Sequence, residues 1–224
     1  MMQQAAVMER EADWTERQRD VLDAVLALLV QSGDAVTMTA VARRASCSKE
    51  TLYKWFGDRD GLLTAAVQRQ ASRVHIANAE AGGLDASSLK MHLTDYAASW
   101  LRVISGPRSV ALNRVAISHA GSERSRLGAI VLENGRFALG RRMKPMLEAG
   151  RAGGLLAFAD AEAAFQTFFG LVARDVQIRL LLGDRIDMTE DRIARDAALA
   201  VDQFLALFGT ASRVANHKDQ PREG

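Results

Sequence analysis

Residues 37–59 carry five basic and two acidic side chains, interleaved with threonine, serine and tyrosine hydroxyls. Such groups can donate hydrogen bonds to phosphate oxygens and to the edges of bases. Apolar residues recur between them at helical spacing, with Val41, Ala42 and Ala45 on one short segment and Leu52 on the next. The pattern favours a nucleic-acid-binding unit built from two short helices.

The residues that begin and end these helices can be read from their types. Thr37, Ser48 and Asp58 are preferred N-cap residues, so a helix is expected to begin after each of them. Residues 46–47 form the break between the first two helices, and Gly57 ends the second. A helix this short is marginal alone, and we expect Leu52, Trp55 and Phe56 to hold the second one on its neighbours.

The side chains left over from this packing form a polar surface. Lys49, Thr51, Tyr53 and Lys54 should face solvent on a helix narrow enough to enter a major groove. Arg59 falls in the first turn of the following helix, where a cation opposes the helix dipole. We interpret that locally unfavourable position as a sign of an outside partner, for which a phosphate is the obvious candidate.

The run from residue 15 to about 73 resembles the DNA-binding domain of the TetR/AcrR family of transcriptional regulators. The resemblance is carried by Gly33, Thr37, Ala42, Ala45, Ser48, Thr51, Leu52, Tyr53, Phe56 and Leu62. It implies that Thr37 and Tyr53 contact phosphates, and that Arg59 stands where the family usually has a phosphate-contacting lysine. The candidate DNA-binding set is Thr37, Thr39, Arg43, Arg44, Ser48, Lys49, Thr51, Tyr53, Lys54 and Arg59.

One departure from the family pattern concerns the turn between the two short helices. The family prefers glycine there, whereas this chain has Ser46. A positive φ at Ser46 would cost about 1 kcal/mol relative to glycine.

Composition predicts an all-α fold. The 224 residues are 48% hydrophobic with only three prolines, and the formal charge is +2. So small a net charge means that DNA affinity has to come from a local patch. A single cysteine excludes an internal disulfide, and residues 1–13 lack the apolar stretch of a leader, so we expect a cytoplasmic protein. The longest apolar run, residues 24–30, is too short to span a membrane.

The chain divides into about nine predicted helices. A helix-turn-helix head of three helices is expected at 15–75, followed by a larger helical ligand-binding and dimerisation domain at 76–211, with flexible ends at 1–14 and 212–224. The fourth helix is expected to run from residue 58 to 82, and the seventh from 123 to 149 with a kink at Pro145. Pro107 suits the first turn of the sixth helix, and Asp160 should cap the eighth.

Apolar stripes on the last two long helices suggest a surface for a second copy of the chain. The stripes comprise Phe168, Val172, Val176, Ile193, Ala197, Ala200, Phe204 and Leu207. The alternative is that both stripes are ordinary core of one chain. The TetR resemblance implies the homodimer, because that family dimerises through its last two long helices. Two recognition helices about 34 Å apart would then read double-stranded DNA with a palindromic operator.

The middle of the chain is expected to form a sensor for a small apolar effector. A pocket of this kind is mainly apolar with a few polar groups, and its candidate residues are Trp100, Ile104, His119, Asn134, Phe137, Met143, Phe165, Phe169 and Arg174. Each of these taken alone is more often a plain core or surface residue. The run at residues 148–160 resembles the passage into the eighth helix of AefR-type regulators.

The sequence contains no motif typical of an enzyme active site. The four histidines, at positions 75, 92, 119 and 217, lack zinc-site spacing, and neither a phosphate-binding glycine loop nor a nucleophile elbow occurs. We expect no cofactor and no metal. Cys47 lies in the turn, but a lone cysteine there is better interpreted as a small hydrophobe than as a redox switch.

The sequence as a whole predicts a DNA-binding regulator. The more specific hypothesis is a repressor released from a palindromic operator by a small-molecule effector. The alternative is a TetR-fold protein that binds DNA without an effector and acts as an architectural or protein-recruiting factor.

Overall fold

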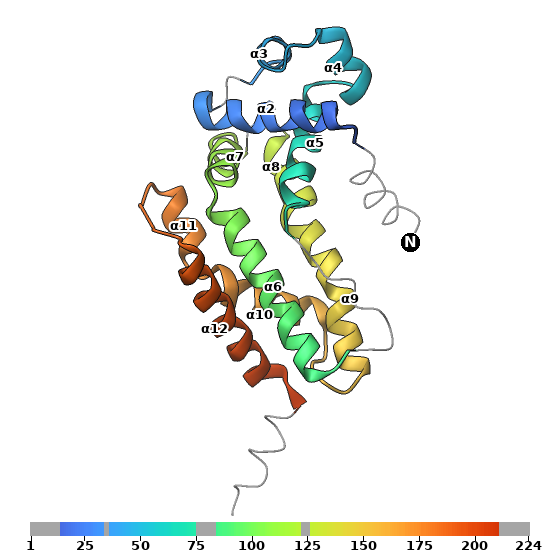
Figure 1. Cartoon of the computed structure of the whole chain (residues 1–224), viewed down its shortest axis with the longest axis vertical. Helices are drawn as coiled ribbons and strands as arrows, with labels where there is room; N and C mark the ends of the chain where they lie inside the picture. The colour runs from blue at the N-terminus through green and yellow to red at the C-terminus, as the bar shows by residue number, and fades with distance from the viewer. Residues whose placement is uncertain (1–13, 34–35, 75–83, 122–125, 211–224) are drawn as a thin grey trace, which may run out of the picture. The chain divides into compact units, whose positions relative to one another are not determined.

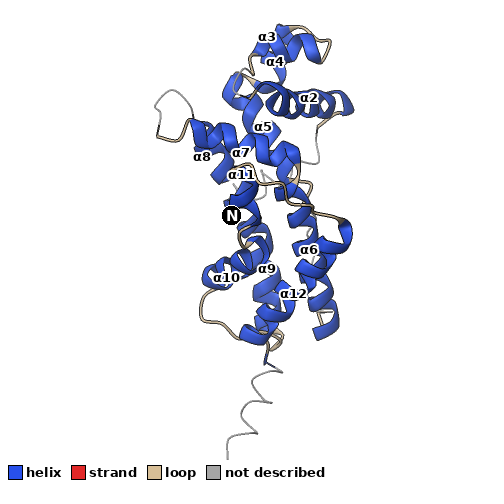
Figure 2. Cartoon of the chain, turned by 90° about the vertical axis from the view of Figure 1, so that its left-hand side faces the viewer, coloured by secondary structure: helices blue, strands red, loops and turns tan. Residues whose placement is uncertain are grey.

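The computed structural model describes residues 14–33, 36–74, 84–121 and 126–210, and this part of the chain consists of helices joined by loops (Figure 2). The all-α prediction is therefore confirmed. The predicted flexible ends lie almost wholly outside the described residues. No helix in the described ranges has both the length and the apolar character needed to cross a membrane.

Two compact units divide the chain. Unit 1 contains the residues up to Arg73 and the segment Val103–Leu139, while unit 2 contains Val74–Arg102 and the residues from Gly140 onward. The chain thus crosses between the units three times. The domain boundary expected near residue 75 stays a prediction. The division into compact units does not show whether the segment 103–139 belongs to the DNA-binding or to the regulatory part.

Unit 1 is built around one central helix, α2. Its helices are α2 (Glu16–Ser32), α3 (Met38–Arg44), α4 (Lys49–Phe56), α5 (Arg59–Ala71), α7 (Pro107–Ser118), α8 (Leu127–Val131) and the π-helix η1 (Leu132–Phe137). In Figures 1 and 2, α3 and α4 lie on one side of α2, and α7 and α8 lie on the other. Val21, Leu22, Val25 and Leu52 are fully buried in the shared core. The pair α3–α4 is thus left exposed on its outer face.

The predicted N-caps of the head are all present. Thr37 Oγ1 accepts from the Ala40 N–H at 3.1 Å, and Ser48 Oγ accepts from the Thr51 N–H at 3.1 Å. Asp58 Oδ1 accepts from the Gly61 N–H at 2.7 Å. Each cap satisfies one backbone donor that a helix start leaves unpaired.

Two predicted helix lengths were wrong. The helix expected to run from 58 to 82 ends at Ala71, where Ser72 is the C-cap and its hydroxyl donates to the Arg69 carbonyl at 3.0 Å. Serine competes for backbone hydrogen bonds in this way and so favours helix ends. Residues 75–83 lie outside the described part. The helix expected at 123–149 is divided into α8, η1 and α9 (Ala138–Ala152), and α9 continues past Pro145.

Unit 2 is an aromatic-cored bundle. It contains most of α6 (Ala86–Ser105) and α9, together with α10 (Ala161–Ala173), α11 (Val176–Leu181) and α12 (Glu190–Phe208). Phe168 of α10 packs edge-on against Phe204 of α12, with ring centroids 5.2 Å apart. The eighth predicted helix is divided at Arg174, whose φ of 42° ends α10, so Val176 lies on α11.

Candidate nucleic-acid interface

The outer face of α3 and α4 carries the side chains predicted to meet DNA. We call it the reading face and define it as Thr37, Thr39, Ser48, Lys49, Thr51, Tyr53 and Lys54. All of these are exposed except Thr51, which is half-buried. Tyr53, 51% exposed, and Lys54 point away from the core, while Leu52 is fully buried and Trp55 and Phe56 pack against it. The predicted division of α4 into a packing face and a free face is therefore confirmed.

The hydroxyls of the reading face form hydrogen bonds within the chain, and the Thr37 hydroxyl can also donate to an outside acceptor. A hydroxyl has one proton to donate and two lone pairs to accept with. Thr37 Oγ1 uses a lone pair for its cap, which leaves its proton for an outside acceptor such as a phosphate oxygen. Ser48 Oγ and Thr51 Oγ1 lie 3.1 Å apart and are hydrogen-bonded to each other.

One acidic side chain reduces the positive charge of this surface. Glu50 is exposed in the first turn of α4, and its pKa is lowered, first by a hydrogen bond from its own backbone N–H and then by the Ser48 hydroxyl. Its carboxylate therefore stays ionised and offsets one of the nearby lysines.

The turn between α3 and α4 has a strained backbone at Ser46, the position where the family prefers glycine. Ser46 has a φ of 49°, in the left-handed region where a serine is disfavoured. Arg17 of α2 holds this turn, since its Nη2 donates to the Ala45 carbonyl at 2.5 Å and to the Ser46 carbonyl at 3.0 Å. Sequence reasoning missed Arg17, and nothing in its local spacing marks a partner 28 residues away.

The three remaining arginines of the predicted DNA-binding set have different surroundings. Arg59 Nε donates to the Val36 carbonyl at 3.0 Å, so Arg59 has a partner within the chain and anchors the segment that leads into α3. A phosphate contact of Arg59 stays a prediction. Arg44 Nη1 donates to Gln31 Oε1 of α2 at 3.1 Å, and Arg43 is exposed. Their role toward DNA stays a prediction.

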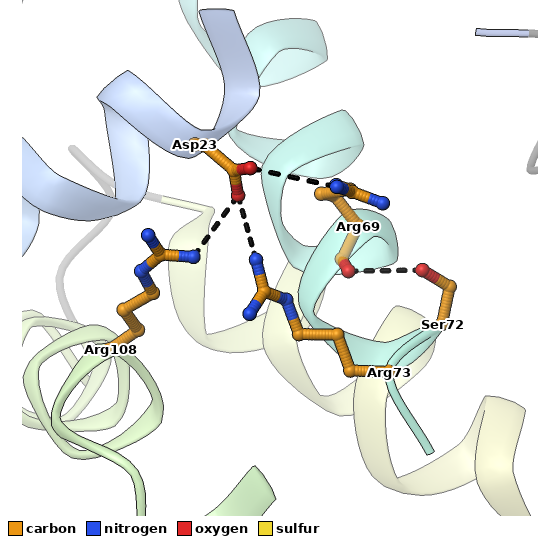
Figure 3. A network of polar contacts seen from close by, with 5 residues as sticks. All are labelled: Asp23, Arg69, Ser72, Arg73 and Arg108. Carbon is orange, nitrogen blue, oxygen red and sulfur yellow. Dashed lines mark hydrogen bonds and ion pairs between the residues drawn. The ribbon is translucent and has the colours of Figure 1, made fainter. Parts of the chain in front are cut away.

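A charged cluster fastens α5 and α7 to α2, as Figure 3 shows. Asp23 of α2 accepts from Arg73 at 2.8 Å and from Arg108 at 3.1 Å, and its other oxygen lies 3.5 Å from Arg69 Nη2. Arg73 and Arg108 lie close to two of the points where the chain passes between the units. We call these four residues the Asp23 cluster; no sequence motif marked it.

The predicted ligand residues do not form one group. Ile104, His119, Asn134 and Phe137 belong to unit 1, while the other five belong to unit 2. Asn134 is engaged within unit 1, where its Oδ1 accepts from Gln68 at 2.9 Å, and Phe137 is 44% exposed beneath the Arg136 guanidinium. Arg174 is an exposed residue at the end of α10. A single site containing all nine stays without support from the described geometry.

Part of the unit 2 group does come together. The rings of Trp100 and Phe169 lie 4.2 Å apart, and those of Phe165 and Phe169 lie 6.2 Å apart. Met143 is fully buried in the same unit. Tyr96, which was not among the predicted ligand residues, packs against Trp100 at 6.1 Å and against Phe168 at 6.0 Å. We call Tyr96, Trp100, Phe165 and Phe169 the aromatic cluster.

Most residues predicted for the dimer surface are core of the single chain. The buried ones are Phe168, Val172, Val176, Ile193, Ala197, Ala200 and Phe204, each at most 5% exposed. Only Leu207, at 54%, is open to solvent. The buried side chains join α10 and α12 within one chain and leave no area for a partner. A second copy that docks on these helices has to contact other residues.

Comparison with known proteins matches two segments of the chain to transcriptional regulators. A family model described as bacterial regulatory proteins of the tetR family matches residues 21–66, and one described as the C-terminal domain of AefR-like transcriptional repressors matches residues 91–210. The HTH-type transcriptional repressor KstR of Rhodococcus jostii is 43% identical over 60 residues. That stretch is 26% of this chain and only 28% of KstR.

Solved structures extend the likeness over almost the whole chain. A TetR transcriptional regulator from Agrobacterium tumefaciens is 43% identical with a TM-score of 0.77, covering 90% of this chain and 99% of that one. The flavonoid-responsive regulator FrrA is 26% identical with a TM-score of 0.63, covering 87% of this chain and 97% of its own.

Proposed function

Because the chain belongs to the TetR family of bacterial transcriptional regulators and carries an AefR-like C-terminal domain, we propose that it is a repressor that binds a palindromic operator as a homodimer and is released by a small apolar effector. The observation that carries the DNA-binding part is the reading face. Its side chains are exposed, and the helix beneath them is anchored by Leu52 and the Ser48 cap.

The reading face suits the major groove of B-DNA. We assign Lys49 and Thr51, in the first turn of α4, to base edges, since N-terminal residues of a recognition helix reach them. Thr37, Tyr53 and Lys54 would donate to phosphates and fix the register. The Arg17 contacts hold the turn before α4 against α2.

A dimer surface is available on the exposed edges of α10 and α12. Leu199 and Leu207 are 46% and 54% exposed and share one side of α12 with Gln203. Gly170 lies exposed inside α10, and a Cβ there would meet no atom of the described residues within 4 Å, apart from its chain neighbours and the backbone of its own helix. A mid-helix glycine costs about 1 kcal/mol relative to alanine, a cost that the single chain does not explain. Close approach of a partner helix would explain it.

Effector control would be located in unit 2. Its aromatic cluster offers large apolar rings, and the similar protein FrrA is named as flavonoid-responsive, which supports a flat organic effector. A 100-fold loss of operator affinity requires about 2.7 kcal/mol of differential binding between the two conformations. A ligand buried among several aromatic rings can supply a difference of that size.

Binding to the DNA that flanks the gene for this chain tests the proposal. Affinity is measured at two salt concentrations with random competitor DNA, for the wild type, for Tyr53→Ala and for Lys90→Ala, a control whose lysine lies on α6 in unit 2. Saturable binding that survives competitor and is weakened only by Tyr53→Ala is the expected result. Equal binding to random DNA would contradict a sequence-specific repressor. Specific binding that no small molecule alters would favour the alternative without an effector.

A further inference from the structure

The Tyr96 hydroxyl is a buried hydrogen-bond donor on α6. Tyr96 is 1% exposed on α6, and its hydroxyl has no hydrogen-bond partner among the residues that the structure describes. Nearly all buried polar groups in native proteins are hydrogen-bonded, because an unpaired one loses its bonds to water without replacement. A phenylalanine would fill almost the same space without that penalty. Packing alone therefore does not account for a tyrosine here.

The hydroxyl is held in the form that donates. Burial raises the pKa of Tyr96 well above its usual value, while the positive charge of Arg142 opposes that rise. Arg142 lies half-buried on α9 and donates to the Val74 carbonyl at 2.9 Å. A neutral O–H close to a guanidinium is a favourable environment for an oxygen that carries negative or partial negative charge.

The ring of Tyr96 packs among other aromatic side chains. The ring centroid of Trp100 lies 6.1 Å from that of Tyr96 and 4.2 Å from that of Phe169. Gly140 of α9 lies so close to Phe165 that a Cβ would stand 2.7 Å from Cε1. Phe169 is half-buried, so it forms the accessible edge of the cluster. A ligand that enters at this edge would contact the rings of Phe169 and Trp100.

We propose that Tyr96 donates a hydrogen bond to the carbonyl or carboxylate oxygen of a flat, mainly apolar effector that lies against Trp100 and Phe169. The inference rests on the proposed effector-responsive function and adds the chemistry of its ligand. Because Trp100 and Tyr96 are almost fully buried, the effector has to displace side chains at the Phe169 edge, as in pockets that open only with ligand.

Three probes of equal ring size test this subsite: 2-naphthoate, 2-acetylnaphthalene and 2-ethylnaphthalene, which lacks the oxygen. Calorimetry measures their binding to the full chain and to Tyr96→Phe. We expect an oxygen-bearing probe to bind the wild type more tightly than the hydrocarbon, and to lose about 10-fold or more in Tyr96→Phe. The hydrocarbon should bind both proteins equally. Equal affinities of every probe for the two proteins, or no binding of any probe to the wild type, would overturn the proposal.

Thermal unfolding without ligand gives a second readout. An unpaired hydroxyl predicts that Tyr96→Phe melts at or above the wild-type temperature. A clearly lower melting temperature would mean that the ligand-free protein already satisfies the hydroxyl, for instance with water, and would also overturn the proposal.

Measuring operator binding in the presence of the probes distinguishes a failure of the Tyr96 subsite from a failure of the proposed function. Probes that bind with the expected pattern but never release the protein from the operator would contradict effector control and support the Tyr96 subsite. An effector that releases wild type and Tyr96→Phe from the operator equally would support effector control and contradict the Tyr96 subsite.

Discussion

The reading face and the aromatic cluster are opposite ways of building a site. On the reading face the side chains are polar and mostly exposed, and its caps Thr37 and Ser48 bond to backbone N–H groups three residues away. In the aromatic cluster the side chains come from α6 and α10, more than 60 residues apart in sequence, and nearly all are buried. Local bonds therefore position the first site and tertiary packing positions the second.

This difference has a consequence for mutations. Truncating a residue of the reading face other than the caps Thr37 and Ser48 should change DNA binding with little effect on stability, since exposed side chains contribute little to folding. Truncating a residue near the aromatic cluster should change stability first, because it leaves a cavity. Four predictions sharpen or break this contrast, from the largest effect to the smallest.

The largest effect is expected from Phe168→Ala. Phe168 is fully buried and packs against Tyr96 and Phe204, so its loss should lower the free energy of unfolding by about 3–5 kcal/mol. Chemical denaturation followed by circular dichroism measures this loss. Gln166→Ala, exposed on the same helix, is the control and should stay within about 0.5 kcal/mol of wild type. A stability loss below 1 kcal/mol would contradict the assignment of Phe168 to the core of one chain.

Asp23→Asn should have an intermediate effect. The change removes the one carboxylate shared by Arg69, Arg73 and Arg108 and leaves three guanidiniums facing each other. Because all four side chains are partly exposed, we expect a loss of about 1–2 kcal/mol that shrinks as salt screens the repulsion. Asp20→Asn, exposed on the same helix, is the matched control. Equal melting temperatures of the two variants at low salt would show that the Asp23 cluster does not hold α5 and α7 on α2.

Ser46→Gly should raise stability. Glycine adopts the φ of 49° at this turn without strain, which gains about 1 kcal/mol, less the added entropy of the unfolded chain. The Arg17 bonds to the turn use backbone carbonyls and survive the change. Ser48→Gly, which loses a cap rather than relieving strain, should not show the gain. A lower melting temperature for Ser46→Gly would mean that the serine side chain has a role beyond the turn.

Lys54→Ala should have the smallest energetic effect but the most specific signature. If Lys54 neutralises one phosphate, its removal weakens binding to all DNA sequences and lowers the slope of log K against log salt by about one unit. Titrations at several salt concentrations measure that slope, with Lys90→Ala as control. A loss confined to one base position would make Lys54 a base reader instead.

The comparison of the two sites also shows how far prediction from sequence reaches here. The caps at Thr37, Ser48 and Asp58 were predictable because an N-cap and the N–H that it accepts from are three residues apart. The Asp23 cluster was not, since Arg108 is 85 residues away from Asp23 and only the fold brings them together. The same limit explains why stripes on α10 and α12 were assigned to a partner rather than to each other.

The sequence by itself determined the helical class, the start of each head helix and the exposed polar surface of α4. Residue type and spacing of three to four positions decide these features, and both are visible in a linear chain. Only the tertiary structure decided where α5 ends, which arginines share Asp23, and which aromatic side chains pack against the ring of Tyr96. These features depend on contacts between segments that are distant in sequence, and such contacts form only when the chain folds around its core.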